Sequence, residues 1–161
     1  MKSLSFLDKL KQEGKLELVE ASEPMAESYE KKSRDCLSAA KLVFNGELYE
    51  NAIGEAYFSM FNAVQSLFFR CGIKCENHSA AAVLLKKLFK ADKIFLTFSK
   101  AKEERIDKQY YTTQMQQRPV TKESAQELIK IAETFILEAS AYKRNLNLKD
   151  ISEIRKNFEK I

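Results

Sequence analysis

Apolar side chains recur three and four residues apart along most of this chain, a spacing that predicts a series of amphipathic helices. We expect helices over residues 3–13, 24–45, 48–71, 79–89, 94–105, 121–142 and 147–161. Between them we expect an arm over residues 16–19, a loop over 73–77 and a polar, exposed loop over 112–117. The sequence therefore predicts an all-α fold.

Helix start and stop signals support these boundaries. Ser22 is a good N-cap for the second helix, and Pro24 suits a first turn, where the missing N–H has no helical partner. Asn45 and Gly46 are typical of a helix C-terminus, and Gly72 ends the third helix in the same way. Thr121 is the expected cap of the sixth helix.

The third predicted helix, residues 48–71, has the strongest pattern. Its main apolar face carries ten side chains: Tyr49, Ala52, Ile53, Ala56, Tyr57, Met60, Ala63, Val64, Leu67 and Phe68. Phe58, Phe61 and Phe69 fall outside that face. A helix that is apolar over most of its circumference is buried on more than one side. We therefore expect it at the centre of the fold, with the three phenylalanines as a homodimer interface.

Composition narrows the fold class further. The 161 residues include only 4 glycines and 2 prolines, too few for the many tight turns of a β-sandwich or barrel. Three cysteines and no signal-like apolar run at the start indicate a reducing, cytoplasmic location. The longest uncharged stretch, residues 56–69, is too short to span a membrane. No cofactor is expected.

Charge and motifs exclude several chemistries. The net charge of +4 permits contact with phosphate without requiring it. Four scattered glycines cannot build a phosphate-binding loop. A single histidine, His78, cannot form a two-histidine metal helix, and no Gly-x-Ser-x-Gly elbow accompanies it.

A zinc site is a weak alternative. Cys71, Cys75 and His78 place three suitable ligands within eight residues, and Cys36 is a conceivable fourth. The simpler interpretation is a helix-end cysteine, a loop cysteine and a histidine at the next helix start.

His78 is also the natural candidate for proton transfer. Its unperturbed pKa, about 6.5, lies closest to neutrality among the side chains here. The competing interpretation is structural, because a histidine at a helix N-terminus commonly caps the helix or anchors a loop.

A second candidate site lies at the end of the fifth predicted helix. Arg105, Asp107, Tyr110 and Tyr111 combine a cation, a carboxylate and two aromatic rings. An arginine beside aromatic rings can bind a phosphate and stack on a base. Alternatively, Asp107 and Tyr110 hold the loop by hydrogen bonds.

Residues 55–63, Glu-Ala-Tyr-Phe-Ser-Met-Phe-Asn-Ala, resemble the E-A-Y-Y-x-M-F-x-A segment of the HEPN domains, in particular their small stand-alone prokaryotic branch. Two further features match: a glycine-containing loop followed by His78-Ser79, and a later counterpart of an R-x-x-x-D-Y element in residues 105–110. The similarity covers about residues 28–142.

This resemblance implies an up-and-down helical bundle that forms homodimers. Many such proteins are encoded beside a minimal nucleotidyltransferase and act with it as a toxin–antitoxin pair. Active toxins are metal-independent ribonucleases that use an arginine and a histidine separated by four to six residues. Other members are thought to bind only a nucleotide or a partner protein.

The chain departs from the catalytic spacing, because seven residues separate His78 from the nearest preceding arginine, Arg70, and no histidine follows Arg105. The leading hypothesis is therefore a dimeric module, with a helical extension over 1–26, a bundle over 27–146 and a C-terminal helix over 147–161. This module would bind a nucleotidyltransferase partner. It would also bind a nucleotide or RNA, through Arg70, His78, Arg105, Asp107, Tyr110 and Tyr111. The alternatives are an endoribonuclease toxin that uses His78 and Arg105, and a structural homodimer without a ligand.

Overall fold

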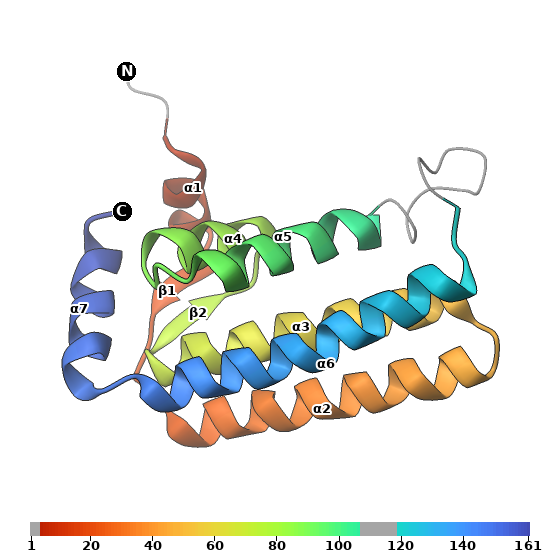
Figure 1. Cartoon of the computed structure of the whole chain (residues 1–161). Helices are drawn as coiled ribbons and strands as arrows, with labels where there is room; N and C mark the ends of the chain where they lie inside the picture. Colours follow the sequence, from red (N-terminus) through yellow and green to blue (C-terminus); the bar gives the residue numbers. More distant parts are fainter. Residues whose placement is uncertain (1–3, 107–118) are drawn as a thin grey trace.

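Three long helices lie side by side and form the framework of the protein (Figure 1). The structure is a computed structural model that describes residues 4–106 and 119–161. The three helices are α2 (Glu23–Asn45), α3 (Tyr49–Arg70) and α6 (Lys122–Asn145), and each packs against the other two. The prediction of an all-α helical bundle is confirmed.

The α3 helix is the centre of this bundle. Besides α2 and α6 it contacts a fifth helix and a short strand, so that most of its circumference is buried. Its buried side chains include Tyr57, Met60, Leu67 and Phe68, none of which has exposed surface. The continuous apolar pattern of this segment is therefore explained by contacts on several sides within one chain.

The helix caps follow the sequence signals closely. The Ser22 hydroxyl accepts a hydrogen bond from the Met25 N–H at 3.2 Å at the start of α2. At the start of α6, Thr121 and Ser124 form a reciprocal capping box. These side chains satisfy N–H groups that have no partner within the helix.

Two shorter helices, α4 (His78–Lys87) and α5 (Asp92–Arg105), form an antiparallel pair above the bundle (Figure 1). The Lys102 ammonium donates to the Ser79 hydroxyl at 2.9 Å, which joins the end of α5 to the start of α4. The pairing therefore brings two sequence-distant positions, His78 and Arg105, to the same end of the pair.

A small antiparallel sheet corrects the prediction of a loop over residues 73–77. Strand β1 (Leu16–Leu18) pairs with β2 (Ile73–Cys75), with Leu16 opposite Cys75. Each strand has three residues, too few for a recognisable alternation of polar and apolar positions. Their pairing spans more than fifty residues of sequence, so only the folded chain reveals it.

The terminal helices α1 (Phe6–Gln12) and α7 (Leu148–Glu159) pack at one end of the bundle (Figure 1). The Lys11 ammonium donates to the carbonyl oxygens of Phe158 and Ile161. Within the described ranges, no helix combines the length and the apolar character needed to cross a bilayer.

Candidate functional site

The only histidine lies in a cluster of aromatic rings, which we call the His78 cluster: His78, Tyr57, Phe58, Phe61 and Arg105. The Tyr57 hydroxyl and Nδ1 of His78 share a hydrogen bond of 2.5 Å. The Phe61 ring stacks on the imidazole, with 3.9 Å between centroids and 10° between planes. These contacts fix the orientation of the imidazole.

Arg105 completes the cluster from the end of α5. Its Cζ atom lies 5.1 Å from the ring centroid of Tyr57 and 4.7 Å from that of Phe58. Both distances are typical of cation–π contacts, which favour the planar guanidinium. Arg105 and His78 are 27 residues apart in the sequence, yet both contact the ring of Tyr57.

Helix α3 supplies the fixed part of the site. Tyr57 and Phe61 are four residues apart and so project from the same face. Tyr57 has no exposed surface, and Phe98 of α5 stacks on it at 5.7 Å. Because the rings are held by the core, the site has a rigid floor.

The start of α4 positions His78, but His78 does not cap the helix. The cap is Asn77, whose side-chain oxygen accepts from the Ala80 N–H at 2.9 Å. His78 is the first residue of the helix, which directs its ring towards α3. The structural interpretation of His78 as a cap is therefore replaced by contact with Tyr57 and Phe61.

The surroundings of His78 lower its pKa. Burial of the imidazole is the largest cause, and the positive charges of Arg105 and Lys102 add to it. All three disfavour the charged imidazolium. At neutral pH the imidazole is therefore neutral, with Nδ1 engaged by Tyr57. Nε2 has no hydrogen-bond partner among residues 4–106 and 119–161.

This shift predicts a dependence of stability on pH. The folded-state pKa lies below the unfolded value, so the unfolded chain binds a proton first as the pH falls. The stability of the wild type should therefore decrease, relative to His78→Gln, as the pH falls from about 6.5 through the folded pKa. Below that pKa the difference should level off. Urea unfolding of both proteins between pH 4 and pH 8 measures it, and parallel curves would contradict the assignment.

Of the remaining predicted ligand residues, the structure describes only Arg70, which does not lie in this cluster. Arg70 ends α3, where its Nε pairs with a Glu23 carboxylate oxygen at 3.0 Å. Arg70 lies thirteen positions after Tyr57 along α3, which corresponds to about 20 Å along the helix axis. Asp107, Tyr110 and Tyr111 lie outside the described residues.

The zinc alternative receives no support from the geometry. Among the described side chains, no group of three histidine, cysteine, aspartate or glutamate residues is arranged to hold a metal ion. Burial raises the pKa of Cys71 to about 12 and that of Cys75 to about 11, so both remain thiols. Zinc binds thiolates, and Tyr57 occupies Nδ1 of His78.

The predicted interface residues Phe58, Phe61 and Phe69 are all half-buried in the single chain. Phe61 stacks on His78, Arg105 lies over Phe58, and Phe69 stacks on Tyr29 of α2 at 5.1 Å. Contacts within the chain therefore cover much of the surface that motivated the dimer. A homodimer through this face stays a prediction.

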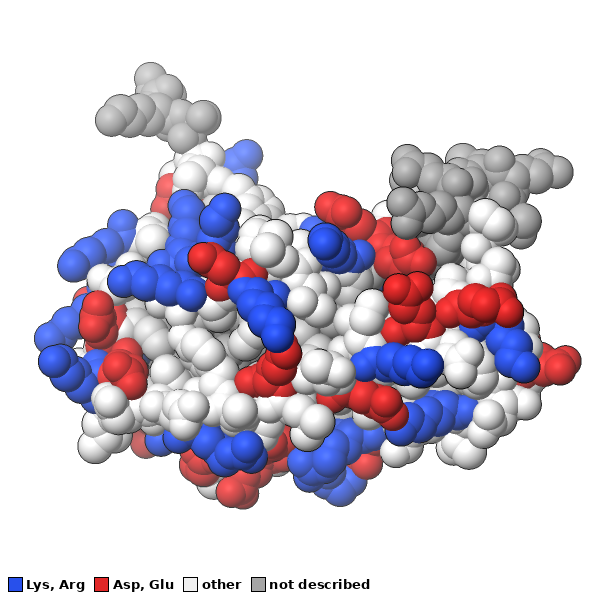
Figure 2. Space-filling view, viewed as in Figure 1, with Lys and Arg blue, Asp and Glu red and all other residues white. Residues whose placement is uncertain are grey.

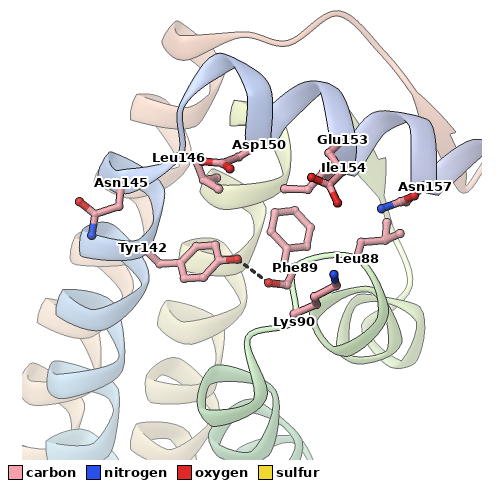
Figure 3. Close-up of a pocket in the computed structure, with 10 residues that line it drawn as sticks. All are labelled: Leu88, Phe89, Lys90, Tyr142, Asn145, Leu146, Asp150, Glu153, Ile154 and Asn157. Atoms are coloured by element: carbon pink, nitrogen blue, oxygen red, sulfur yellow. Dashed lines mark hydrogen bonds between the residues drawn. The ribbon is translucent and has the colours of Figure 1, made fainter.

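Two of the cavities in the described part of the chain lie at different positions relative to the cluster. One, of about 430 Å³, shares the walls Phe58 and Phe61 with it. The other, of about 420 Å³, lies between α7 and the turn after α4 (Figure 3). At its floor the Tyr142 hydroxyl donates to the Phe89 carbonyl at 2.5 Å. Lys90 and Glu153 at its edge are exposed, so this second cavity is a solvated cleft.

Sequence reasoning named His78 and Arg105 but missed Tyr57 and Phe61 as site residues. Both were assigned to packing, Tyr57 to the main apolar face and Phe61 to a dimer interface. The signal that could have identified Tyr57 was its position on a buried helix face, because a buried tyrosine hydroxyl needs a hydrogen-bond partner.

Comparison with known proteins identifies the core of the fold. The model of the HEPN domain family matches residues 26–142, which include most of α2, all of α3 to α5, most of α6 and every residue of the His78 cluster. No curated protein matches the chain. Since the matched region is well over half of the sequence, this chain belongs to the HEPN domain family.

Proposed function

We propose that this protein is a HEPN binding module that holds a nucleotide or an RNA segment at the His78 cluster and engages a minimal nucleotidyltransferase in a toxin–antitoxin-like system. The observation that carries the ligand part is the position of His78 and Arg105 against the same ring, that of Tyr57. The partner part is supported by family membership.

The chemistry of the cluster suits a phosphate-bearing ligand. A guanidinium offers several N–H donors in one plane and binds phosphate oxygens in pairs. Lys102, beside Ser79, adds a second positive charge near the imidazole. A neutral His78 can donate a hydrogen bond from Nε2 to a phosphate oxygen or a ribose hydroxyl.

The rest of the visible surface favours a local site over a broad electrostatic one. Basic and acidic side chains are interspersed across the face in Figure 2, without a continuous basic stripe. Affinity for an anionic ligand therefore depends on a few placed cations, and Arg105 is the one stacked on the aromatic floor.

A second candidate is a metal-independent endoribonuclease, favoured by the hydrogen bond between Tyr57 and Nδ1 of His78. In this reaction Nε2 takes the proton of a ribose 2′-hydroxyl, and the oxygen attacks the adjacent phosphorus. The bond to the 5′-oxygen breaks, and that oxygen takes up the proton that Nε2 accepted, so that the imidazole ends neutral. Arg105 stabilises the charge on the phosphate.

Incubation of a labelled single-stranded RNA with the purified protein in excess EDTA separates the two candidates. The wild-type binding module should retain the RNA in a filter or anisotropy assay and leave it intact, and the RNA should also stay intact with His78→Ala. Cleavage that persists in EDTA and disappears in His78→Ala would establish the ribonuclease instead. Absence of both binding and cleavage would refute both candidates.

The partner is tested separately by co-expression with a minimal nucleotidyltransferase. We expect the two proteins to elute together in size-exclusion chromatography, with a mass that also gives the number of copies of each. Separate elution at micromolar concentrations would contradict the partner assignment without affecting the ligand assignment.

A further inference from the structure

The cavity of about 430 Å³ between α2 and α3 has an aromatic wall. Tyr29, Phe58 and Phe61 line it. Flat ligands such as nucleobases stack favourably on rings of this kind. The volume lies within the range of about 300–1,000 Å³ that small-molecule sites occupy.

Two buried amides on α3 also line this cavity. Asn62 is 5% exposed and Gln65 is 4% exposed, and their spacing of three residues places them on one face of the helix. Asn62 Nδ2 donates to the Phe58 carbonyl at 2.8 Å, and Gln65 Nε2 donates to the Cys75 carbonyl at 3.1 Å. A carbonyl oxygen can only accept, so the amide atom that faces it must be the nitrogen, and these partners determine which end of each amide is which.

The amide oxygens of Asn62 and Gln65 are therefore acceptors without a hydrogen-bond partner in the described part of the chain. Buried acceptors are normally satisfied, and one left without a partner is destabilising. The ligand that complements them presents N–H donors on a planar edge. Guanine offers adjacent donors, the ring N1–H and the exocyclic amine.

Charge at the mouth of the cavity argues against a phosphate there. Glu55 and Glu76 contribute two negative charges and Lys32 one positive charge. A phosphate attached to a base in this cavity is better placed towards Arg105. The guanidinium of Arg105 covers the ring of Phe58, which is itself part of the cavity wall.

From these observations we infer that the cavity between α2 and α3 is a nucleobase pocket for a base with a donor edge, preferably guanine. The inference rests on the proposed function, because it supplies the base pocket for a nucleotide whose phosphate Arg105 and His78 hold. Phe58 and Phe61 are shared by the two parts of the site.

The half-buried Cys36 gives a direct measure of occupancy, because it lines the cavity. Burial and the charge of Glu55 raise the pKa of its thiol, so alkylation by iodoacetamide is best followed at about pH 8.5. Cys71 and Cys75 are buried, and burial raises their pKa values to about 12 and about 11. Mass spectrometry should therefore detect one fast modification, which Cys36→Ser removes.

We expect guanosine, which carries no phosphate, to slow the alkylation of Cys36 in the wild-type protein. Inosine lacks only the exocyclic amine and should need about tenfold more nucleoside for equal protection, the effect of one hydrogen bond. Gln65→Met should weaken protection by guanosine by a similar factor. Arg105→Gln should leave guanosine unaffected and weaken guanosine monophosphate about tenfold or more.

The outcomes separate this inference from the proposed function. If RNA binding depends on Arg105 but no nucleoside protects Cys36, the base pocket is refuted and the proposed function stands. If guanosine protects Cys36 but Arg105→Gln changes neither the monophosphate nor RNA, the base pocket stands and the proposed function fails. If the protection of Cys36 from alkylation does not depend on guanosine but increases with protein concentration, a second copy of the chain covers this face and the inference is overturned. The wild-type measurements require no variant to fold.

Discussion

Replacing Gly72 with alanine is expected to lower the free energy of unfolding by about 3 kcal/mol or more. Gly72 has a φ of 71°, where a Cβ is strained. A Cβ at this position would lie 2.5 Å from the Val19 carbonyl oxygen and 2.8 Å from the Ala21 nitrogen. Both are backbone atoms, so the main chain itself must move.

The same methyl group would displace Arg155. Its Nη1 donates to the carbonyl oxygens of Val19, Cys71 and Gly72 at 2.8, 2.9 and 3.1 Å. These hydrogen bonds connect α7 to the end of α3 and to the segment after β1. We therefore expect loosening of the C-terminal helix as well as a loss of global stability.

Gly14→Ala is the matched control for Gly72→Ala. Gly14 has nearly the same φ, 68°, but a methyl group on its Cα would meet no atom within 4 Å. Only the backbone strain remains, about 1 kcal/mol. Urea unfolding curves of the two variants compare the losses directly. Equal losses would show that steric contact at Gly72 contributes nothing beyond the left-handed conformation.

Arg105→Gln is expected to weaken binding of single-stranded RNA or a nucleotide about ten- to a hundredfold. Hydrogen bonds to charged groups contribute about 1.5–3 kcal/mol, and each 1.4 kcal/mol is a factor of ten in Kd. The slope of log Kd against log salt concentration should also decrease by about one, the value expected for the loss of one phosphate contact. Fluorescence anisotropy between 50 and 200 mM salt measures both quantities.

Two further variants make this result specific. Arg105→Lys keeps the charge but loses the planar fork, so it should recover part of the affinity. Arg144→Gln removes an exposed arginine of α6, whose Nη1 donates to the Ser140 hydroxyl, and should have little effect. If Arg144→Gln weakens binding as much as Arg105→Gln, the His78 cluster is not the anion site.

The spacing between arginine and histidine in this chain differs from that of the family's toxins, but folding brings Arg105 and His78 together. The toxins that this chain resembles use an arginine and a histidine within a few residues of each other. Here Arg105 and His78 come from different helices and both contact Tyr57. We propose that a cluster assembled in this way binds an anion, and the RNA experiment in EDTA tests whether it also cleaves RNA.

The helical framework could be predicted from the sequence, because apolar periodicity and helix caps are local properties. Ser22 and Thr121 cap α2 and α6 as predicted, and the apolar circumference of α3 indicated its central position. The resemblance around Glu55–Ala63 was sufficient to recognise the family, which the match over residues 26–142 shows.

Which residues far apart in the sequence come into contact depends on the tertiary structure. The pairing of α4 with α5 brings Arg105 and His78 to the ring of Tyr57. The pairing of β1 with β2 joins two segments that lie more than fifty residues apart in the sequence. Likewise, the amides of Asn62 and Gln65 line a cavity only because α2 and β2 lie beside α3. Such contacts arise from packing between elements, and local periodicity carries no information about them.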